Sequence, residues 1–377
     1  MRLIDPAGAV RVRIAAAGDI GVVGTGRARA RREGFATPLA AIAPVFAAAD
    51  LAFANLEFPV AEPGWVEPGR SAEFWHDADL IPALARAGVR VVSIANNHIM
   101  DCGPRGLART REACAAAGIA TVGAGSDLAA ARAPAWFAVG GERVMVLAYA
   151  APGAPGDVAR GDAPGIAPLE ADLVREDLAR WGGEATVKIV SVHWGSMYVD
   201  YPPPRVLELA RVLADAGVDL VLGHHPHVVQ AFDRTGRTLT LYSLGDGAFN
   251  GGAGDVRASV GAETRLGSAV FTALIAETPG LEMTPCVLDP DGFPRAATPA
   301  EAEEIRGRVT GLAASMRDAA ERFAAQSAPQ LLRYELELIG AHLRHGRFDR
   351  IVRIMGSLRP RHLPILWHAV RRARRSS

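Results

Sequence analysis

Residues 219–230 read DLVLGHHPHVVQ, an apolar run that ends in three histidines within five positions. A short apolar run bounded by glycine and proline is typical of a buried strand, here over 218–222. The stretch before it, 204–216, has helical periodicity and is followed by Gly217, as a helix C-terminus requires. The segment therefore predicts a helix–strand unit of an α/β fold. Its histidine cluster indicates metal binding, because a structural histidine rarely needs neighbours of its own kind.

The same helix–strand alternation extends over residues 10–230 and predicts an α/β domain. We expect strands at 10–17, 51–54, 89–95, 135–139, 143–149, 187–193 and 218–222, and helices at 37–49, 78–87, 104–117, 168–180 and 204–216. After residue 230 the strand patterns at 238–243, 268–276 and 282–288 have no helices between them. This later part predicts antiparallel strands that complete or adjoin the sheet.

The composition changes again near residue 298, where strand patterns stop. Residues 299–323 and 328–345 have a helical pattern, so we divide the chain into a domain at 1–297 and a helical extension at 298–377. Residues 344–375 contain ten arginines and one acidic residue, Asp349. This stretch is either an amphipathic subdomain docked on the core, or a surface for a membrane or a membrane-bound synthase.

The overall composition is that of an ordinary globular protein, with 377 residues, 49% hydrophobic residues and a formal net charge of zero. Zero net charge and the absence of a nucleic-acid-binding motif argue against a nucleic-acid partner. Three cysteines form no CxxC pair and are expected to be reduced and buried. No apolar stretch reaches membrane-spanning length and no signal peptide is evident, so we expect a cytoplasmic protein, with peripheral association at a membrane as the alternative.

Polar residues of metal-ligand type follow the end of each predicted core strand. Because binding sites in open α/β sheets form outside the carboxyl ends of strands, these residues should share one crevice. The donors are carboxylates, an amide and imidazoles without thiolates, a set that suits Mn²⁺, Fe²⁺ or Zn²⁺. They are too many for one tetrahedral ion and fit two divalent ions about 3.5–4 Å apart that share a carboxylate. The residues are Asp19, Asn55, Glu57, Asn96, Asn97, His98, Asp101, His193, His224, His225 and His227.

Six motifs resemble the CapA family, named for poly-γ-glutamate capsule biosynthesis, within the calcineurin-like metallophosphoesterase superfamily. They are AAAGDI (15–20), ADLAFANLEFPV (49–60), AGVRVVSIANNHIMDCG (87–103), VSVHWG (191–196), DAGVDLVLGHHPHVVQ (215–230) and LYSLGD (241–246). The resemblance covers roughly residues 10–250. It implies a four-layer α/β/β/α sandwich of metallophosphoesterase type, to which this chain adds a C-terminal helical extension.

The resemblance also implies a role for each motif residue. Asp19 would bind one ion, Glu57 would bridge both, and Asn97 and His193 would bind the second. His225 and His227 would bind one ion each, and a water or hydroxide between the ions would be the nucleophile. His98 would be the catalytic histidine, oriented by Asp101. Candidate substrate contacts are Asn55, Asn96, His224, Tyr198 and Arg205, with loop packing as the alternative for Tyr198 and Arg205.

Gly21 stands where the superfamily usually has a histidine, which CapA-type proteins also commonly lack. The chain departs from the family pattern at two further positions, where Met197 replaces a common glutamate and Asp246 a common asparagine. The changes at Met197 and Asp246 weaken the case for the capsule polymer as substrate. We expect a metal-dependent hydrolase of phosphoesters or related bonds. One alternative is an enzyme that makes or cleaves amide or γ-glutamyl bonds, with a glutamyl-containing small molecule or polymer as substrate. Another is a non-catalytic accessory protein of a polymer-assembly complex.

Overall fold

The computed structural model describes residues 1–151, 157–250 and 268–327, and within them two large β-sheets. In the nine-stranded first sheet the order is β1-β16-β15-β2-β3-β4-β5, with β14 beside β2 and β17 beside β16. The bounds are β1 Arg2–Ile4, β16 Gly280–Leu288, β15 Ser268–Ile275, β2 Val12–Gly21, β3 Leu51–Leu56, β4 Val89–Ser93, β5 Ala120–Val122, β14 Asp246–Phe249 and β17 Pro294–Ala296.

The second sheet has six strands in the order β12-β13-β11-β10-β8-β7. The bounds are β12 Phe232–Thr235, β13 Thr238–Leu241, β11 Leu220–His224, β10 Val187–His193, β8 Glu142–Ala150 and β7 Ala135–Val139. A further two-stranded pair joins β6 Ala124–Gly125 to β9 Gly165–Ile166. The central strands of both large sheets are parallel, from β2 to β5 and from β8 to β13, so their carboxyl ends lie on one side.

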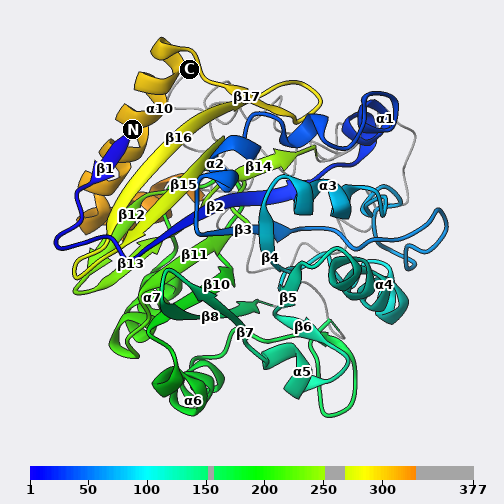
Figure 1. Cartoon of the computed structure of the whole chain (residues 1–377), viewed down its shortest axis with the longest axis horizontal. Coiled ribbons are helices and arrows are strands. Elements are labelled where there is room, and N and C mark those ends of the chain that lie inside the picture. Colours follow the sequence, from blue (N-terminus) through cyan, green and yellow to red (C-terminus); the bar gives the residue numbers. More distant parts are fainter. Residues whose placement is uncertain (152–156, 251–267, 328–377) are drawn as a thin grey trace.

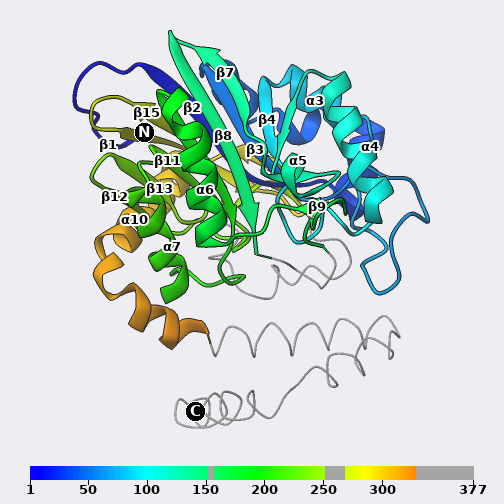
Figure 2. The same cartoon turned by 90° about the horizontal axis from the view of Figure 1, so that it is seen from below.

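Helices cover the outer faces of both sheets (Figure 1). Alternate residues of β8 show the layering: Val144 and Val146 belong to the core between the sheets, whereas Met145 and Leu147 pack on the outer side. Helices α6 Ala171–Trp181 and α7 Pro204–Asp215 complete this outer layer, as Figure 2 shows. Helices α2 Ala43–Ala47, α3 Leu80–Arg86 and α4 Gly103–Ala116 pack along the first sheet. The predicted four-layer sandwich is therefore confirmed.

The C-terminal helical part begins at α10 Pro299–Ala314, which packs against β16 and β12. Thr298 and Glu301 form a capping box that satisfies backbone donors at the start of α10. The short 3-10 turn Met316–Asp318 follows, and residues 319–327 are helical again. The predicted helix at 299–323 is thus interrupted by that turn. The predicted helix at 328–345 and the arginine-rich stretch 344–375 lie outside the described residues.

Several predicted elements differ from those in the structure. The expected helix at 37–49 is split into a 3-10 turn, Thr37–Leu39, and the five-residue α2, each with proline in its first turn. Strand 238–243 was expected in an antiparallel part, but β13 runs parallel to β11, because the chain reverses twice through the β12–β13 hairpin. Two helices without apolar periodicity were not predicted, α1 Gly24–Glu33 and α5 Leu128–Arg132.

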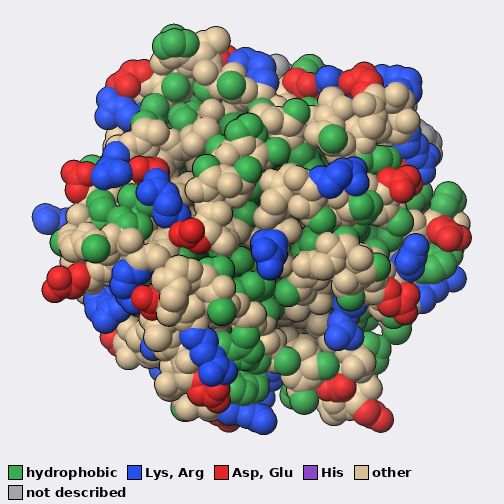
Figure 3. All heavy atoms as spheres, in the orientation of Figure 1, with side chains coloured by type: hydrophobic (Ala, Val, Ile, Leu, Met, Phe, Trp, Pro, Cys, Tyr) green, Lys and Arg blue, Asp and Glu red, His purple; other side chains and the backbone are tan. Residues whose placement is uncertain are grey.

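The molecular surface carries charges of both signs. Figure 3 shows Lys and Arg side chains interspersed with Asp and Glu side chains over one face. Among the described helices, none combines the length and the apolar character that crossing a membrane requires. Cys102, Cys114 and Cys286 are buried free thiols, as predicted from their spacing.

Candidate metal centre

Three polar residues of the first sheet lie side by side because the strand register aligns them. Asp19 of β2 pairs with Asn55 of β3 on one side and with Asp246 of β14 on the other. Asp19 lies within its strand, two residues before the end, rather than just past it as predicted. The approach of β14 depends on Gly18, because a Cβ there would lie 1.8 Å from the carbonyl oxygen of Gly245. Any side chain at position 18 would therefore displace the turn that precedes Asp246.

The second sheet aligns its own donors in the same way. His193 ends β10, His224 ends β11, and the two residues are paired in register. Immediately after β11 the chain turns sharply, with φ of 97° at His225 and 54° at His227. Positive φ is costly for a residue with a Cβ and persists where surrounding contacts enforce it, often at functional sites. The strained turn brings both of these histidines toward the carboxylates of the first sheet.

The donors form two clusters, and the first, the Asp19 cluster, consists of Asp19, Glu57 and His227. One ligand atom from each of the three residues lies within 4.8 Å of the others. Asp19 Oδ2 lies 3.4 Å from His227 Nδ1. The same imidazole nitrogen lies 2.8 Å from Asp246 Oδ1. Asp246 was noted in the sequence only as a departure from the family pattern, and the structure shows that it contacts a histidine of this cluster.

The second cluster, the His193 cluster, consists of Glu57, Asn97, His193 and His225. His193 Nε2 lies 2.7 Å from Asn97 Oδ1 and 3.1 Å from His225 Nδ1. Its distance to Glu57 Oε1 is 3.7 Å. Glu57 therefore belongs to both clusters, which is the position that a bridging carboxylate would occupy. All six residues expected to bind metal are brought together in these two clusters.

The two carboxylates at the centre of the clusters are buried without a permanently charged cationic partner. Asp19 and Glu57 are fully buried, and within the described part of the chain neither pairs with Arg or Lys. Burial, followed by the charge of Asp19, raises the pKa of Glu57 well above its usual range. For Asp19, burial raises the pKa, but the hydrogen bond and charge of His224 and the charge of His227 outweigh it, so the pKa is lowered.

Both histidines of the His193 cluster are held in the neutral form. Burial, and then the neighbouring His227, lowers the pKa of His225 to about 3. Burial, followed by the charge of His225, lowers the pKa of His193 well below its usual range. Neutral imidazoles offer lone pairs to a cation. Glu57 Oε1 has no hydrogen-bond partner among the described residues. Divalent ions of the Mn²⁺, Fe²⁺ or Zn²⁺ type would meet these requirements together, so the residues present fit the metals that the sequence predicts.

Asn55, Asn96 and His224 orient the donors. The Asn55 amide donates to Asp19 Oδ1 at 2.8 Å and to Glu57 Oε2, which leaves Asp19 Oδ2 and Glu57 Oε1 facing the histidines. His224 Nδ1 lies 3.1 Å from Asp19 Oδ1. Asn96 donates to the Leu56 carbonyl at 2.9 Å. All three side chains are buried. Their role as substrate contacts stays a prediction.

His98 lies beside the clusters in a separate network. Its Nδ1 is 2.8 Å from Asp101 Oδ2, as expected for an orienting carboxylate. Asp101 Oδ1 is 3.0 Å from a guanidinium nitrogen of Arg70, which also bonds the buried Asp157. The His98 ring lies edge-on to Phe74, with centroids 4.9 Å apart. Sequence patterns did not indicate Arg70 and Phe74, because both lie in the irregular segment between β3 and α3.

Of the two loop residues proposed as substrate contacts, Tyr198 lies near the site. Its ring centroid is 6.0 Å from that of His227, and its backbone φ is 60°. Arg205 lies exposed in the first turn of α7. None of the hydrogen bonds or ion pairs among the described residues connects Arg205 to either cluster.

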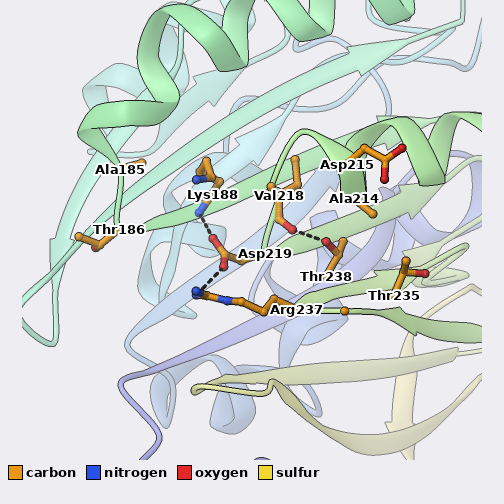
Figure 4. A pocket seen from close by; sticks show the side chains of 12 residues that line it. Ala185, Thr186, Lys188, Ala214, Asp215, Val218, Asp219, Thr235, Arg237 and Thr238 are labelled. Carbon is orange, nitrogen blue, oxygen red and sulfur yellow. Dashed lines mark hydrogen bonds and ion pairs between the residues drawn. The ribbon is translucent and has the colours of Figure 1, made fainter.

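A cavity of about 630 Å³ lies elsewhere, at the amino ends of β10 and β13 (Figure 4). It is distinct from the candidate metal centre, which follows the carboxyl ends of the strands. Asp219 in its wall accepts from the Lys188 backbone at 2.8 Å and from Arg237 at 3.3 Å. The Thr238 hydroxyl donates to the Val218 carbonyl at 2.6 Å. These contacts join the strand starts, and we assign the cavity no ligand.

The family model described as "Bacterial capsule synthesis protein PGA_cap" matches residues 13–251, a range that includes every donor of both clusters. The chain belongs to this family. A capsule biosynthesis protein CapA of Bacillus anthracis is 30% identical over 218 residues, covering 56% of this PGA_cap family member and 53% of that protein.

A probable polyglutamine synthesis accessory protein of Mycobacterium tuberculosis is 35% identical over 213 residues, covering 53% of this chain and 55% of that protein. The PGA_cap family member described here thus spans about half the length of the curated relatives it matches. Among solved structures, a putative 5'-nucleotidase from Staphylococcus aureus is similar with a TM-score of 0.46 at 12% identity, covering 79% of this chain and 58% of that one.

Proposed function

We propose that this protein is a dimetal-dependent hydrolase of phosphoesters or related bonds. The observation that carries the proposal is the position of Glu57, a fully buried carboxylate shared by two clusters of nitrogen and oxygen donors. A structural carboxylate would be expected to have a cationic or hydrogen-bonding partner for each oxygen. Oε1 of Glu57 makes no hydrogen bond among the described residues, and the His193 imidazole 3.7 Å away has a lowered pKa that favours its neutral form. With two ions bound, such an arrangement would suit a site that clamps the attacking and leaving oxygens of a displacement reaction.

Each cluster would hold one divalent transition-metal ion, Mn²⁺, Fe²⁺ or Zn²⁺. Asp19 and His227 would hold the first, Asn97, His193 and His225 the second, and Glu57 both. When bound, the ions would supply Lewis acidity and lower the pKa of water. The other residues orient these ligands: Asn55 fixes the two carboxylates, and Asp246 fixes the His227 ring through Nδ1.

His98 would act on the leaving group. Asp101 holds its Nδ1, so Nε2 is the nitrogen that remains to donate a proton to the departing oxygen. Phe58 and Phe74 pack around the imidazole, with ring centroids 5.2 Å and 4.9 Å away, and fix its plane. The side chain is 23% exposed, so it can reach a bound substrate.

The substrate is proposed from the relatives. Their printed names concern capsule biosynthesis and polyglutamine synthesis, which supports a phosphorylated intermediate or the polymer itself as substrate. The same names support the alternative that the site makes or cleaves γ-glutamyl amide bonds. Met197 and Asp246 differ from the residues common in the family, which is why phosphoester chemistry on another metabolite remains our first choice.

The two chemistries are separated by one activity panel. Metal-stripped protein would be supplied with Mn²⁺, Fe²⁺ or Zn²⁺ and assayed on aryl phosphates, a nucleotide and γ-glutamyl peptides. We expect hydrolysis of phosphoesters only, lost in Glu57→Gln. It should be retained in the control Glu184→Gln, which changes an exposed glutamate paired with Arg143. Activity confined to glutamyl peptides would replace our choice with the alternative. No metal-dependent activity on either class would reject both.

A non-catalytic accessory role is the remaining proposal, supported by the word "accessory" in the name of the mycobacterial relative. The arginine-rich stretch 344–375 would then contact a membrane or a membrane-bound synthase. Removing residues 344–377 and measuring co-sedimentation with anionic vesicles tests this role. Unchanged co-sedimentation would end it.

A further inference from the structure

The metal-binding turn is held by a loop that follows the neighbouring strand. The Tyr198 backbone donates to the Pro226 carbonyl at 2.8 Å, between the two strained histidines. The Gln230 side chain donates to the Val199 carbonyl at 2.7 Å. The segment 225–231 after β11 and the loop 194–203 after β10 are thus joined at two points. Since His225 and His227 supply one proposed ligand to each ion, both ions depend on this junction.

A residue of the C-terminal helix α10 ties the two segments together from outside. One guanidinium nitrogen of Arg308 donates to the Val229 carbonyl at 2.8 Å, and the other pairs with the Asp200 carboxylate. Val229 belongs to the segment 225–231 and Asp200 to the loop 194–203, so Arg308 contacts both. Gln326 accepts from the Asp200 backbone at 3.2 Å and so adds a second attachment from the C-terminal part. Figure 2 shows α10 alongside β12 and α7.

Contacts of Tyr201 strengthen the attachment of the C-terminal part to the loop 194–203. The Tyr201 hydroxyl lies 2.8 Å from Ser315 Oγ. Tyr201 also packs with Ala231 and Leu312 in a small buried cluster. The C-terminal part therefore contacts both the loop after His193 and the segment after His227.

We propose that Arg308 is a positioning residue for the metal centre: it holds the strained turn at His225 and His227 in its ion-binding conformation through Val229 and Asp200. The physical reason is that positive φ at two non-glycine residues is costly, and such a turn relaxes unless neighbouring contacts enforce it. When the turn relaxes, two ligands leave the clusters, so metal affinity falls. The inference rests on the proposed function, because it requires that these histidines bind metal. It makes α10 part of the metal centre although no residue of α10 is a ligand.

The test measures Mn²⁺ binding to the full chain by equilibrium dialysis with elemental analysis. We expect Arg308→Gln to weaken Mn²⁺ binding at least tenfold, and Asp200→Asn to weaken it in the same direction. In the double variant Arg308→Gln/Asp200→Asn, the fold-loss in Mn²⁺ affinity should be smaller than the product of the two single fold-losses, because the two side chains contact each other. Arg308→Lys should restore part of the affinity, since an ammonium can still pair with Asp200. The matched control is Arg306→Gln, because Arg306 lies on the same helix and pairs only with Glu303 among the described residues.

The outcomes separate the inference from the proposed function. Wild-type protein that binds no Mn²⁺ would reject both. Wild-type binding that is equally strong in Arg308→Gln and Asp200→Asn would overturn the inference and leave the proposed function standing. If Arg308→Gln does not fold, Asp200→Asn decides alone. The Asp200 side chain is 31% exposed, so we expect the protein to tolerate asparagine at this position. Equal losses in Arg308→Gln and Arg306→Gln would also overturn the inference, since of these two arginines only Arg308 touches the two segments.

Discussion

Replacing Glu57 with glutamine should stabilise the metal-free protein and destabilise the metal-loaded one. In the metal-free state the Glu57 and Asp19 carboxylates lie within 4.8 Å of each other in the protein interior. With an effective dielectric constant of about 20, two like charges at that distance repel by 332/(20 × 4.8), or about 3.5 kcal/mol. The raised pKa of Glu57 means that part of this repulsion is already relieved by protonation. We therefore expect a gain of about 1–3 kcal/mol in the free energy of unfolding.

In the presence of metal, Glu57→Gln should lower the stability of the protein relative to wild type instead of raising it. At a free ion concentration of about one hundred times the dissociation constant, binding adds about 2.7 kcal/mol per site to the wild-type protein. The variant loses the shared ligand and gains much less. The assay is urea unfolding of both proteins after EDTA dialysis and again in Mn²⁺. The matched control is Asp219→Asn, another buried carboxylate, which accepts from the Lys188 backbone and from Arg237 outside the site.

Asp219→Asn should destabilise the protein by about 1–3 kcal/mol in both conditions, since it weakens structural hydrogen bonds. If Glu57→Gln behaves like this control, with an equal loss with and without Mn²⁺, then Glu57 is a structural residue and the reasoning is refuted.

Three further predictions concern residues around the centre. Asp246→Asn should weaken the binding of one Mn²⁺ about 10–100-fold in equilibrium dialysis, and unchanged affinity would assign Asp246 to packing alone. Arg70→Gln should keep its metal content but slow phenyl phosphate hydrolysis more than p-nitrophenyl phosphate hydrolysis, because Asp101 then orients His98 less well; equal slowing would contradict this. Burial lowers the pKa of His76 to about 3, below the value of about 6.5 for an unfolded chain. Between these two pH values the unfolded state binds more protons, so the free energy of unfolding should fall as pH decreases from about 6.5 toward about 3. The expected loss is about 1.4 kcal/mol for each pKa unit of difference. In urea titrations His76→Gln should flatten that loss, and an unchanged slope would count against burial as its cause.

Much of the fold could be predicted because buried parallel strands are short apolar runs between helices. The strand pattern at 187–193 corresponds to β10 without any difference in its ends. The sequence failed to predict elements that are held by tertiary contacts and lack an apolar pattern of their own. Helix α1 buries Gly26, Arg27 and Ala30 instead of an apolar stripe, so its periodicity gives no signal. Strand β14 is four residues long and pairs with β2 only because Gly18 permits the approach of Gly245.

The candidate site shows the same limit. Ligand-type residues at strand ends could be found by position alone, since parallel strands deliver their carboxyl ends to one edge. Residues that orient the ligands could not, because they arrive through tertiary contact from segments without periodicity. Arg70 reaches Asp101 from the irregular segment before α3, and Arg308 reaches Val229 from a helix 79 residues away in sequence.

The most direct test of the central claim is a crystal structure of the Mn²⁺-loaded protein with anomalous diffraction measured at the manganese edge. We predict two anomalous peaks about 3.5–4 Å apart, with the Glu57 carboxylate between them, His227 at one and His193 at the other. A single peak, or two peaks that Glu57 does not join, would contradict it.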